Sequence, residues 1–185
     1  MKKRWFIALL ALVLFAVIAC WQGLIVRKYT LEMHKLTESI RVVQISDLHA
    51  CRYGRNQRNL IRKIEALEPD VIVLTGDIAD EDKSLDAVEA FLTQITAKFP
   101  CYYVSGNHEG RFDDPNEVLA WFASQGVCVL QGAGENLPIK DQTIGIYGLD
   151  DVQLIGTAQW RDDLQQMNDG LDLQQVNLLL SIILN

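Results

Sequence analysis

The chain has 185 residues, of which 49% are hydrophobic and 22% are charged. This composition suits one domain with a hydrophobic core and excludes a disordered chain or a small disulfide scaffold. Five of the 17 basic residues lie in the first 28 positions, so the remainder holds 12 basic against 24 acidic residues. Such an acidic sequence repels a phosphate backbone, which argues against a nucleic-acid-binding module.

The chain begins with a long uncharged segment. Residues 5–26 carry no formal charge, and as a helix they would measure about 33 Å, enough to cross a hydrocarbon layer of about 30 Å. Lys2, Lys3 and Arg4 precede this segment, which favours a domain on the far side of the membrane from the amino terminus. We therefore expect residues 1–28 to be a single-pass membrane anchor. The alternatives are a lipoprotein signal ending at Cys20 and a buried core helix.

Strand and helix patterns alternate after a mixed connector at residues 29–40. Strand patterns occur at residues 41–46, 70–75, 101–105, 127–130 and 144–147, and helical spacing of apolar residues occurs at 56–67, 84–99 and 118–125. Residues 154–167 give no clear pattern. The alternation predicts an α/β fold with right-handed crossovers, in one domain covering residues 41–185.

A polar cluster follows each of the first three predicted strands. The clusters are Asp47-Leu48-His49, Gly76-Asp77 and Gly106-Asn107-His108-Glu109. Asp47, Asp77 and Asn107 are spaced 30 residues apart, and a βαβ unit takes about 30 residues. The three clusters therefore return to the same carboxyl edge of a parallel sheet, where such sheets bind ligands. Taken singly, each cluster is more often a cap or a turn. Together they predict a site for a manganese, iron, zinc or magnesium ion.

In order and spacing, the three clusters resemble the first three motifs of the calcineurin-like metallophosphoesterases: Asp-x-His, Gly-Asp and Gly-Asn-His-Asp/Glu. The resemblance runs from about residue 41 to residue 181. The chain is most similar to the membrane-associated bacterial branch of that family. It implies an α/β sandwich and metal-dependent hydrolysis of phosphate esters at a bacterial cell membrane. Some relatives in that branch act on phosphodiesters or on the pyrophosphate of a nucleotide-linked lipid precursor. A phosphate-ester substrate, with a lipid or nucleotide attached, is therefore expected, and the sequence indicates no protein partner.

The resemblance also implies roles for individual residues. Asp47 and His49 would bind a first divalent metal ion, Asp77 would bridge two ions, and Asn107 would bind the second. Two such ions clamp the phosphoryl oxygens and acidify a water molecule. His108 would be the catalytic residue that stabilises charge or protonates the leaving oxygen.

Neighbouring residues are expected to support this site. Glu109 would fix either the loop or the imidazole of His108. Arg52 and Arg55 follow His49 closely and are candidates for orienting a substrate phosphate, although arginines in such loops are usually only exposed.

The later motifs of the family have no counterpart in this sequence. Those motifs are a His after an apolar strand and Gly-His-x-His, whereas this chain has three histidines in total. Residues 176–181 resemble the strand that precedes the missing His, and loss of one base from codons for Ser-His-His-Pro-Glu would give the observed Ser-Ile-Ile-Leu-Asn. We therefore expect a truncated domain, an incomplete sandwich that binds at most one of the two metal ions.

Two functions follow as hypotheses. The first is a membrane-tethered metallophosphoesterase, impaired by the loss of its last ligands. The alternative is a tethered domain without catalytic activity, either binding a metal or phosphate ligand or existing as an inert fragment.

Overall fold

The computed structural model describes residues 24–182. The chain divides into two compact units, residues 1–31 and 32–185, and every helix and strand of the described residues lies in the second unit.

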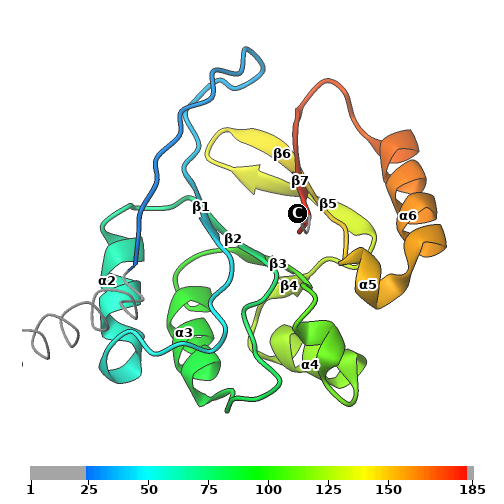
Figure 1. Cartoon of the computed structure of the whole chain (residues 1–185). Coiled ribbons are helices and arrows are strands. Elements are labelled where there is room, and N and C mark those ends of the chain that lie inside the picture. The colour runs from blue at the N-terminus through cyan, green and yellow to red at the C-terminus, as the bar shows by residue number, and fades with distance from the viewer. Residues whose placement is uncertain (1–23, 183–185) are drawn as a thin grey trace, which may run out of the picture. The chain divides into compact units, whose positions relative to one another are not determined.

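A four-stranded parallel sheet forms the centre of this unit, with the strand order β1-β2-β3-β4. Its strands are β1 (Val42–Ile45), β2 (Val71–Thr75), β3 (Cys101–Val104) and β4 (Cys128–Val129). The segments between them are η1 (Arg55–Gln57), α2 (Arg58–Glu65), α3 (Asp86–Thr96), η2 (Glu109–Arg111) and α4 (Pro115–Ser124). Figure 1 shows α2, α3 and α4 together on one side of this sheet. This is the predicted α/β arrangement with a parallel sheet.

A second, three-stranded sheet lies on the other side, with the order β5-β6-β7 (Figure 1). It consists of β5 (Ala133–Ile139), β6 (Gln142–Gly148) and β7 (Val176–Leu180), and the chain between β6 and β7 forms α5 (Val152–Ile155) and α6 (Thr157–Gly170). β5 and β6 are antiparallel, whereas β6 and β7 are parallel. The two sheets and the flanking helices together form a layered sandwich.

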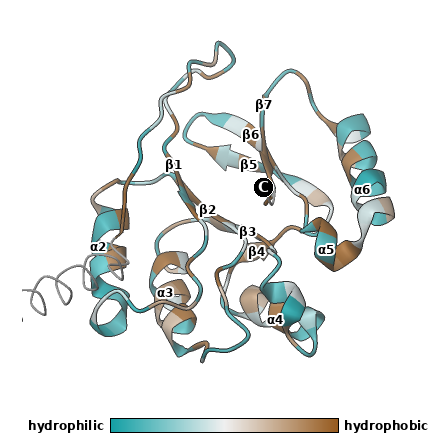
Figure 2. Cartoon of the chain, in the orientation of Figure 1, coloured by the Kyte–Doolittle hydropathy of each residue, from teal (hydrophilic) through white to brown (hydrophobic). Residues whose placement is uncertain are grey.

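The hydrophobic core between the sheets explains their packing. Alternate residues of a strand point to opposite faces, so Val71 and Val73 of β2 face the second sheet and meet Ile144 and Ile146 of β6 in one buried cluster. On the helix side, Tyr103 of β3 stacks on Phe122 of α4 with ring centroids 4.2 Å apart. β2 is therefore buried on both faces, which accounts for its continuous apolar sequence. Figure 2 shows the contrasting case of α6, which is largely hydrophilic and buries only Met167.

The second sheet contains the element that the sequence analysis missed. β5 was not predicted, because Gly134 and Pro138 interrupt its sequence and both residues are rare within strands. Among the described residues β5 pairs with β6 alone and forms an edge of the sheet. Proline is tolerated on an edge strand because the outer side needs no hydrogen-bond donor. The unclear segment at residues 154–167 is largely helical and contributes most of α6.

The predicted membrane helix and the single-pass membrane localisation are corrected by the structure. No helix among residues 24–182 is long and apolar enough to cross a bilayer. The longest described helix, α6, has 14 residues and spans about 21 Å, short of the roughly 30 Å of a hydrocarbon layer. Of the predicted span, residues 5–23 lie outside the described residues, and residues 24–26 form no helix.

Candidate metal centre and active site

The three polar clusters meet at the carboxyl ends of β1, β2 and β3, as the 30-residue spacing predicts. The loop after β1 runs along the loop after β2, because the backbone N–H of His49 donates to the Asp77 carbonyl at 2.9 Å and that of Ala50 donates to the Ile78 carbonyl at 3.0 Å. The N–H of His108, after β3, donates to Asp77 Oδ1 at 3.0 Å. Asp77 on the central loop is therefore tied to both neighbouring loops.

Asp47, His49 and Asp77 present a set of donor atoms that fits a divalent metal ion. One ligand atom from each of these residues lies within 4.8 Å of the others, and His49 Nε2 lies 3.9 Å from Asp47 Oδ1. Asp77 is buried, whereas Asp47 is exposed, so the site opens to solvent on one side. Two carboxylates and one imidazole suit manganese, iron or zinc better than a soft metal ion that prefers thiolate ligands.

Asn107 lies against the same carboxylate. In the amide orientation that satisfies both of its contacts, Nδ2 donates to Asp77 Oδ2 at 3.2 Å and the carbonyl oxygen accepts from Arg111 Nη2 at 3.0 Å. With the N–H of His108 on the other oxygen, both carboxylate oxygens of Asp77 are engaged. Asn107 is thus placed beside the predicted bridging residue.

Of the two roles predicted for Glu109, the structure shows the first, in which the carboxylate fixes the loops of the site. In the described structure no hydrogen bond joins this carboxylate to the imidazole of His108. Its side chain is fully buried. Oε1 accepts from the N–H groups of Ile78 and Ala79 at 2.9 Å each, and Oε2 accepts from those of Asp77 at 2.9 Å and Gly106 at 2.8 Å. Burial raises the pKa of Glu109, although these backbone hydrogen bonds partly counteract the effect. One carboxylate therefore joins the loop after β2 to the loop after β3.

The backbone around the site is unusual in two respects. Asp47, His49 and Asp77 all have positive φ angles, of 54°, 46° and 54°, a conformation that costs about 1–2 kcal/mol per residue with a Cβ. In addition, a Cβ on Gly106 would lie 2.3 Å from Asp77 Oδ1, which is closer than two atoms can approach. Strain of this kind concentrates at functional sites, and a glycine at residue 106 is required for Asp77 to reach its position.

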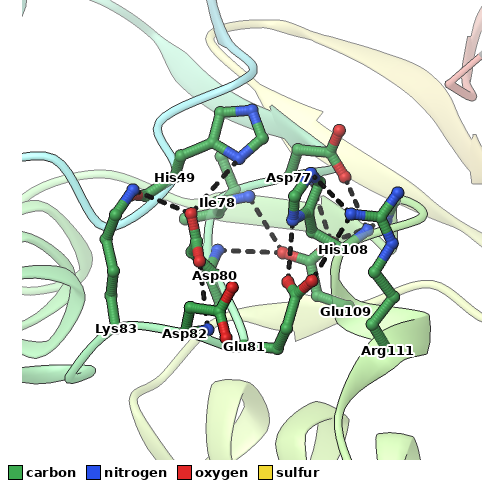
Figure 3. Close-up of polar contacts among 12 residues, drawn as sticks. His49, Asp77, Ile78, Asp80, Glu81, Asp82, Lys83, His108, Glu109 and Arg111 are labelled. Carbon is green, nitrogen blue, oxygen red and sulfur yellow. Dashed lines mark hydrogen bonds and ion pairs between the residues drawn. The ribbon is translucent and has the colours of Figure 1, made fainter.

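The surroundings of His108 contain residues that the sequence analysis missed. His108 Nδ1 lies 2.8 Å from Glu81 Oε2, and His108 Nε2 lies 3.3 Å from Arg111 Nη1 (Figure 3). The ring of His108 also meets that of His49 edge to face, with centroids 4.4 Å apart. Arg111 lies four residues after Asn107, so proximity in the sequence was the one available signal.

Asp80 forms a further part of this network. Its Oδ2 accepts from Lys83 Nζ at 2.8 Å, and this hydrogen bond lowers the pKa of Asp80. Asp80 Oδ2 also lies 3.9 Å from His49 Nδ1, and Asp80, His49 and His108 form a second group with ligand atoms within 4.8 Å of one another. His49 therefore presents one ring nitrogen to Asp47 and the other to Asp80.

The predicted phosphate-orienting arginines are placed differently from Arg111. Arg52 is exposed and lies 3.8 Å from Asp86 at the start of α3, and Arg55 begins η1. Arg111, in contrast, contacts both Asn107 and His108.

Comparison with known proteins gives a family match over most of the domain. Residues 40–178 match the calcineurin-like phosphoesterase family. The chain is 30% identical over 148 residues to a Bos taurus transmembrane protein with a metallophosphoesterase domain, covering 74% of this chain and 31% of that protein. It is 28% identical over 140 residues to the uncharacterized metallophosphoesterase YkuE of Bacillus subtilis, covering 72% and 49% respectively. The chain thus spans about a third to a half of the length of these relatives.

Two further similarities concern a shorter segment and the fold. The chain is 35% identical over 74 residues to the UDP-2,3-diacylglucosamine pyrophosphatase LpxG of Chlamydia muridarum, covering 38% of this chain and 22% of that protein. The crystal structure of phosphopantetheinyl hydrolase from Mycobacterium tuberculosis superposes with a TM-score of 0.51 at 16% identity, covering 78% of this chain and 68% of that one. The structural similarity supports the same fold.

Proposed function

We propose, from the premise that this chain belongs to the calcineurin-like phosphoesterase family, that its polar edge is a metal-dependent site for phosphoester hydrolysis. The observation that carries the proposal is the convergence of Asp47, His49 and Asp77, with ligand atoms within 4.8 Å. The contacts of Asn107 and the N–H of His108 with Asp77 extend that group. The domain that holds the site is residues 41–185.

The proposed roles follow from the surroundings of each residue. Asp47, His49 and Asp77 would hold a divalent cation. Asn107 would become a ligand for a second ion once its amide turns the carbonyl oxygen from Arg111 towards Asp77. Bound divalent ions supply Lewis-acid chemistry, in which they polarise phosphoryl oxygens and acidify water. His108, partly exposed beside these ligands, exchanges a proton with the substrate. The fully buried Glu109 holds the backbone that carries Asp77.

The number of ions is a separate question. Asp47, His49 and Asp77 supply three ligands, the number that protein provides in a catalytic zinc site. The second ion would have only Asp77 and Asn107 among the predicted ligands. We expect at most one ion per chain to bind tightly, and metal analysis that finds two equivalents after dialysis would refute this.

The activity test uses a generic substrate and an isosteric variant. We expect the protein to hydrolyse an aryl phosphate or a bis-aryl phosphate when manganese, zinc or iron is added, and the Asp77→Asn variant to lose this activity. Asp162→Asn removes an equal charge at an exposed position of α6 and should behave as the unmodified protein. Hydrolysis that is indifferent to metal and to Asp77 would refute the proposal.

The substrate class is proposed from a relative. The Chlamydia protein is named as a pyrophosphatase of UDP-2,3-diacylglucosamine. This supports testing a lipid- or nucleotide-linked pyrophosphate beside mono- and diesters. Metal binding at Asp77 without hydrolysis of any of these compounds would favour the alternative, a binding domain without catalytic activity.

A further inference from the structure

The loop after β6 carries two buried acidic residues that the proposed function does not use. Asp150 and Asp151 follow β6 closely and are 2% and 1% exposed. Burial removes a carboxylate from water, which costs free energy unless hydrogen bonds replace the lost contacts. The hydrogen-bond partners of these residues therefore indicate what the loop after β6 holds in place.

Asp150 is hydrogen-bonded to Ser105, the first residue after β3. Its Oδ1 accepts from the backbone N–H of Ser105 at 3.2 Å and from the Ser105 hydroxyl at 2.5 Å. Ser105 is fully buried, so water does not compete for these hydrogen bonds, and the low local dielectric strengthens them. Asp150 thus joins the second sheet to the loop after β3, residues 105–111.

The segment after β6 also contacts the loop after β3 at a second point. Asp151 caps α5 with its side chain. A Cβ on Gly110 would lie 3.6 Å from Leu154 Cδ1, so α5 packs beside the glycine of η2. The contacts at Ser105 and Gly110 therefore lie on either side of residues 107–109, which belong to the candidate site.

The end of β6 lies close enough to the first sheet for these contacts to form. A Cβ on Gly148 would lie 2.5 Å from Val104 Cγ1 and 2.3 Å from Leu130 Cβ, which is closer than two carbon atoms can pack. Glycine at residue 148 therefore allows β6 to approach the end of β3. The N–H of Leu149 donates to the carbonyl of Leu180 on β7 at 2.9 Å, so the second sheet fixes the start of the loop.

We propose that Asp150 is a positioning residue, through which the second sheet holds the loop after β3 in the conformation that presents Asn107 and His108 to the site. It acts through Ser105 and the backbone of that loop, whose His108 N–H reaches Asp77 Oδ1 at 3.0 Å. Loss of a group that supports metal ligands in this way typically weakens metal binding about ten- to a hundredfold. The effect on metal binding rests on the proposed function, whereas the effect on the loop does not.

Hydrogen exchange of the metal-free protein measures the loop directly. Asp150→Ala removes the acceptor of two hydrogen bonds and should speed exchange of the Gly106 and His108 N–H groups by about ten- to a hundredfold. Asp150→Asn keeps Oδ1 as the acceptor of both hydrogen bonds and should stay within about threefold of the unmodified protein. Ser105→Ala removes the hydroxyl donor but keeps the N–H, so it should give a smaller acceleration of the same two groups.

Tyr102→Phe is the matched control, because it removes another hydrogen bond between the two sheets. The Tyr102 hydroxyl donates to Glu135 Oε1 at 2.6 Å and joins β3 to β5, from a residue within the strand rather than in the loop. This variant should lower the free energy of unfolding and leave loop exchange unchanged. In calorimetric titration with manganese, Asp150→Ala should bind about ten- to a hundredfold more weakly, whereas Asp150→Asn and Tyr102→Phe should bind as the unmodified protein does.

The outcomes distinguish this inference from the proposed function. Loop exchange and manganese affinity that are the same in Asp150→Ala as in Tyr102→Phe would overturn the positioning role. If Asp150→Ala does not fold, Ser105→Ala takes its place in the comparison, and exchange at the rate of the unmodified protein would overturn the role equally. Absence of manganese binding in the unmodified protein overturns the proposed function, and exchange in the metal-free protein still decides whether Asp150 positions the loop.

Discussion

Replacing Glu109 by glutamine tests the central structural claim, that one buried carboxylate joins the loops of the site. The two oxygens of Glu109 accept four backbone hydrogen bonds, two each. A glutamine keeps one oxygen and turns an NH₂ group towards the other two N–H donors, so two buried donors lose their acceptor. Each costs about 1–3 kcal/mol, so the free energy of unfolding should fall by about 2–6 kcal/mol.

Urea unfolding followed by circular dichroism measures this change. Glu117→Gln, at an exposed position in the first turn of α4, is the control and should change the free energy of unfolding by no more than about 0.5 kcal/mol. Because a mutation of this size is a large fraction of the total stability of a small domain, the midpoint should move clearly. A loss below about 1 kcal/mol for Glu109→Gln, similar to that of the control, would show that the carboxylate does not hold these loops.

Three further predictions concern the backbone, the acid dependence of stability and a buried thiol. Asp47→Gly removes the Cβ at a positive φ of 54° and should raise the free energy of unfolding of the metal-free protein by about 1 kcal/mol relative to Asp47→Ala. Calorimetric titration should show weakened metal binding in both variants. Equal free energies of unfolding for the two variants would contradict the backbone strain at residue 47. Burial alone would raise the pKa of Asp70, but hydrogen bonds from Lys140 and the Arg41 backbone lower it overall. The ionised Asp70 therefore stabilises the folded protein at a pH above its pKa in the unfolded chain. This contribution is lost as the pH falls through its pKa in the folded protein. Asp70→Asn should therefore cost about 1–3 kcal/mol at neutral pH and progressively less in acid, and a cost independent of pH in urea titrations would refute this. Burial raises the pKa of Cys101 to about 12. Iodoacetamide at about pH 8 should therefore alkylate Cys101 on the order of a thousandfold more slowly in the native than in the unfolded protein. Comparable alkylation rates, measured by peptide mass spectrometry, would contradict the burial of Cys101.

The sequence by itself determined the sheet of parallel strands and the edge at which the site lies. Apolar segments such as residues 70–75 end at polar clusters, and the 30-residue spacing from Asp47 to Asp77 to Asn107 matches one βαβ unit per step. The spacing can be read from the sequence because each βαβ crossover returns the chain to the same edge of the sheet after a similar number of residues. The resemblance to the metallophosphoesterases rested on these residues, and the family match confirms it.

Only the tertiary structure revealed the second sheet in full and the partners of each side chain at the site. β5 contains Gly134 and Pro138, so its strand conformation depends on pairing with β6 rather than on the preferences of its own residues. The contact of Glu81 with His108 joins residues 27 positions apart, and no repeating pattern in the sequence connects them.

The membrane prediction at the amino terminus rested on hydropathy, and residues 5–23 of the predicted span lie outside the described residues. A long apolar run predicts a membrane helix from hydropathy alone, but in residues 24–182 no helix has the length and apolar character to cross a bilayer. Spacing along the chain therefore determined where the site residues converge, whereas long-range packing decided which atoms of those residues meet.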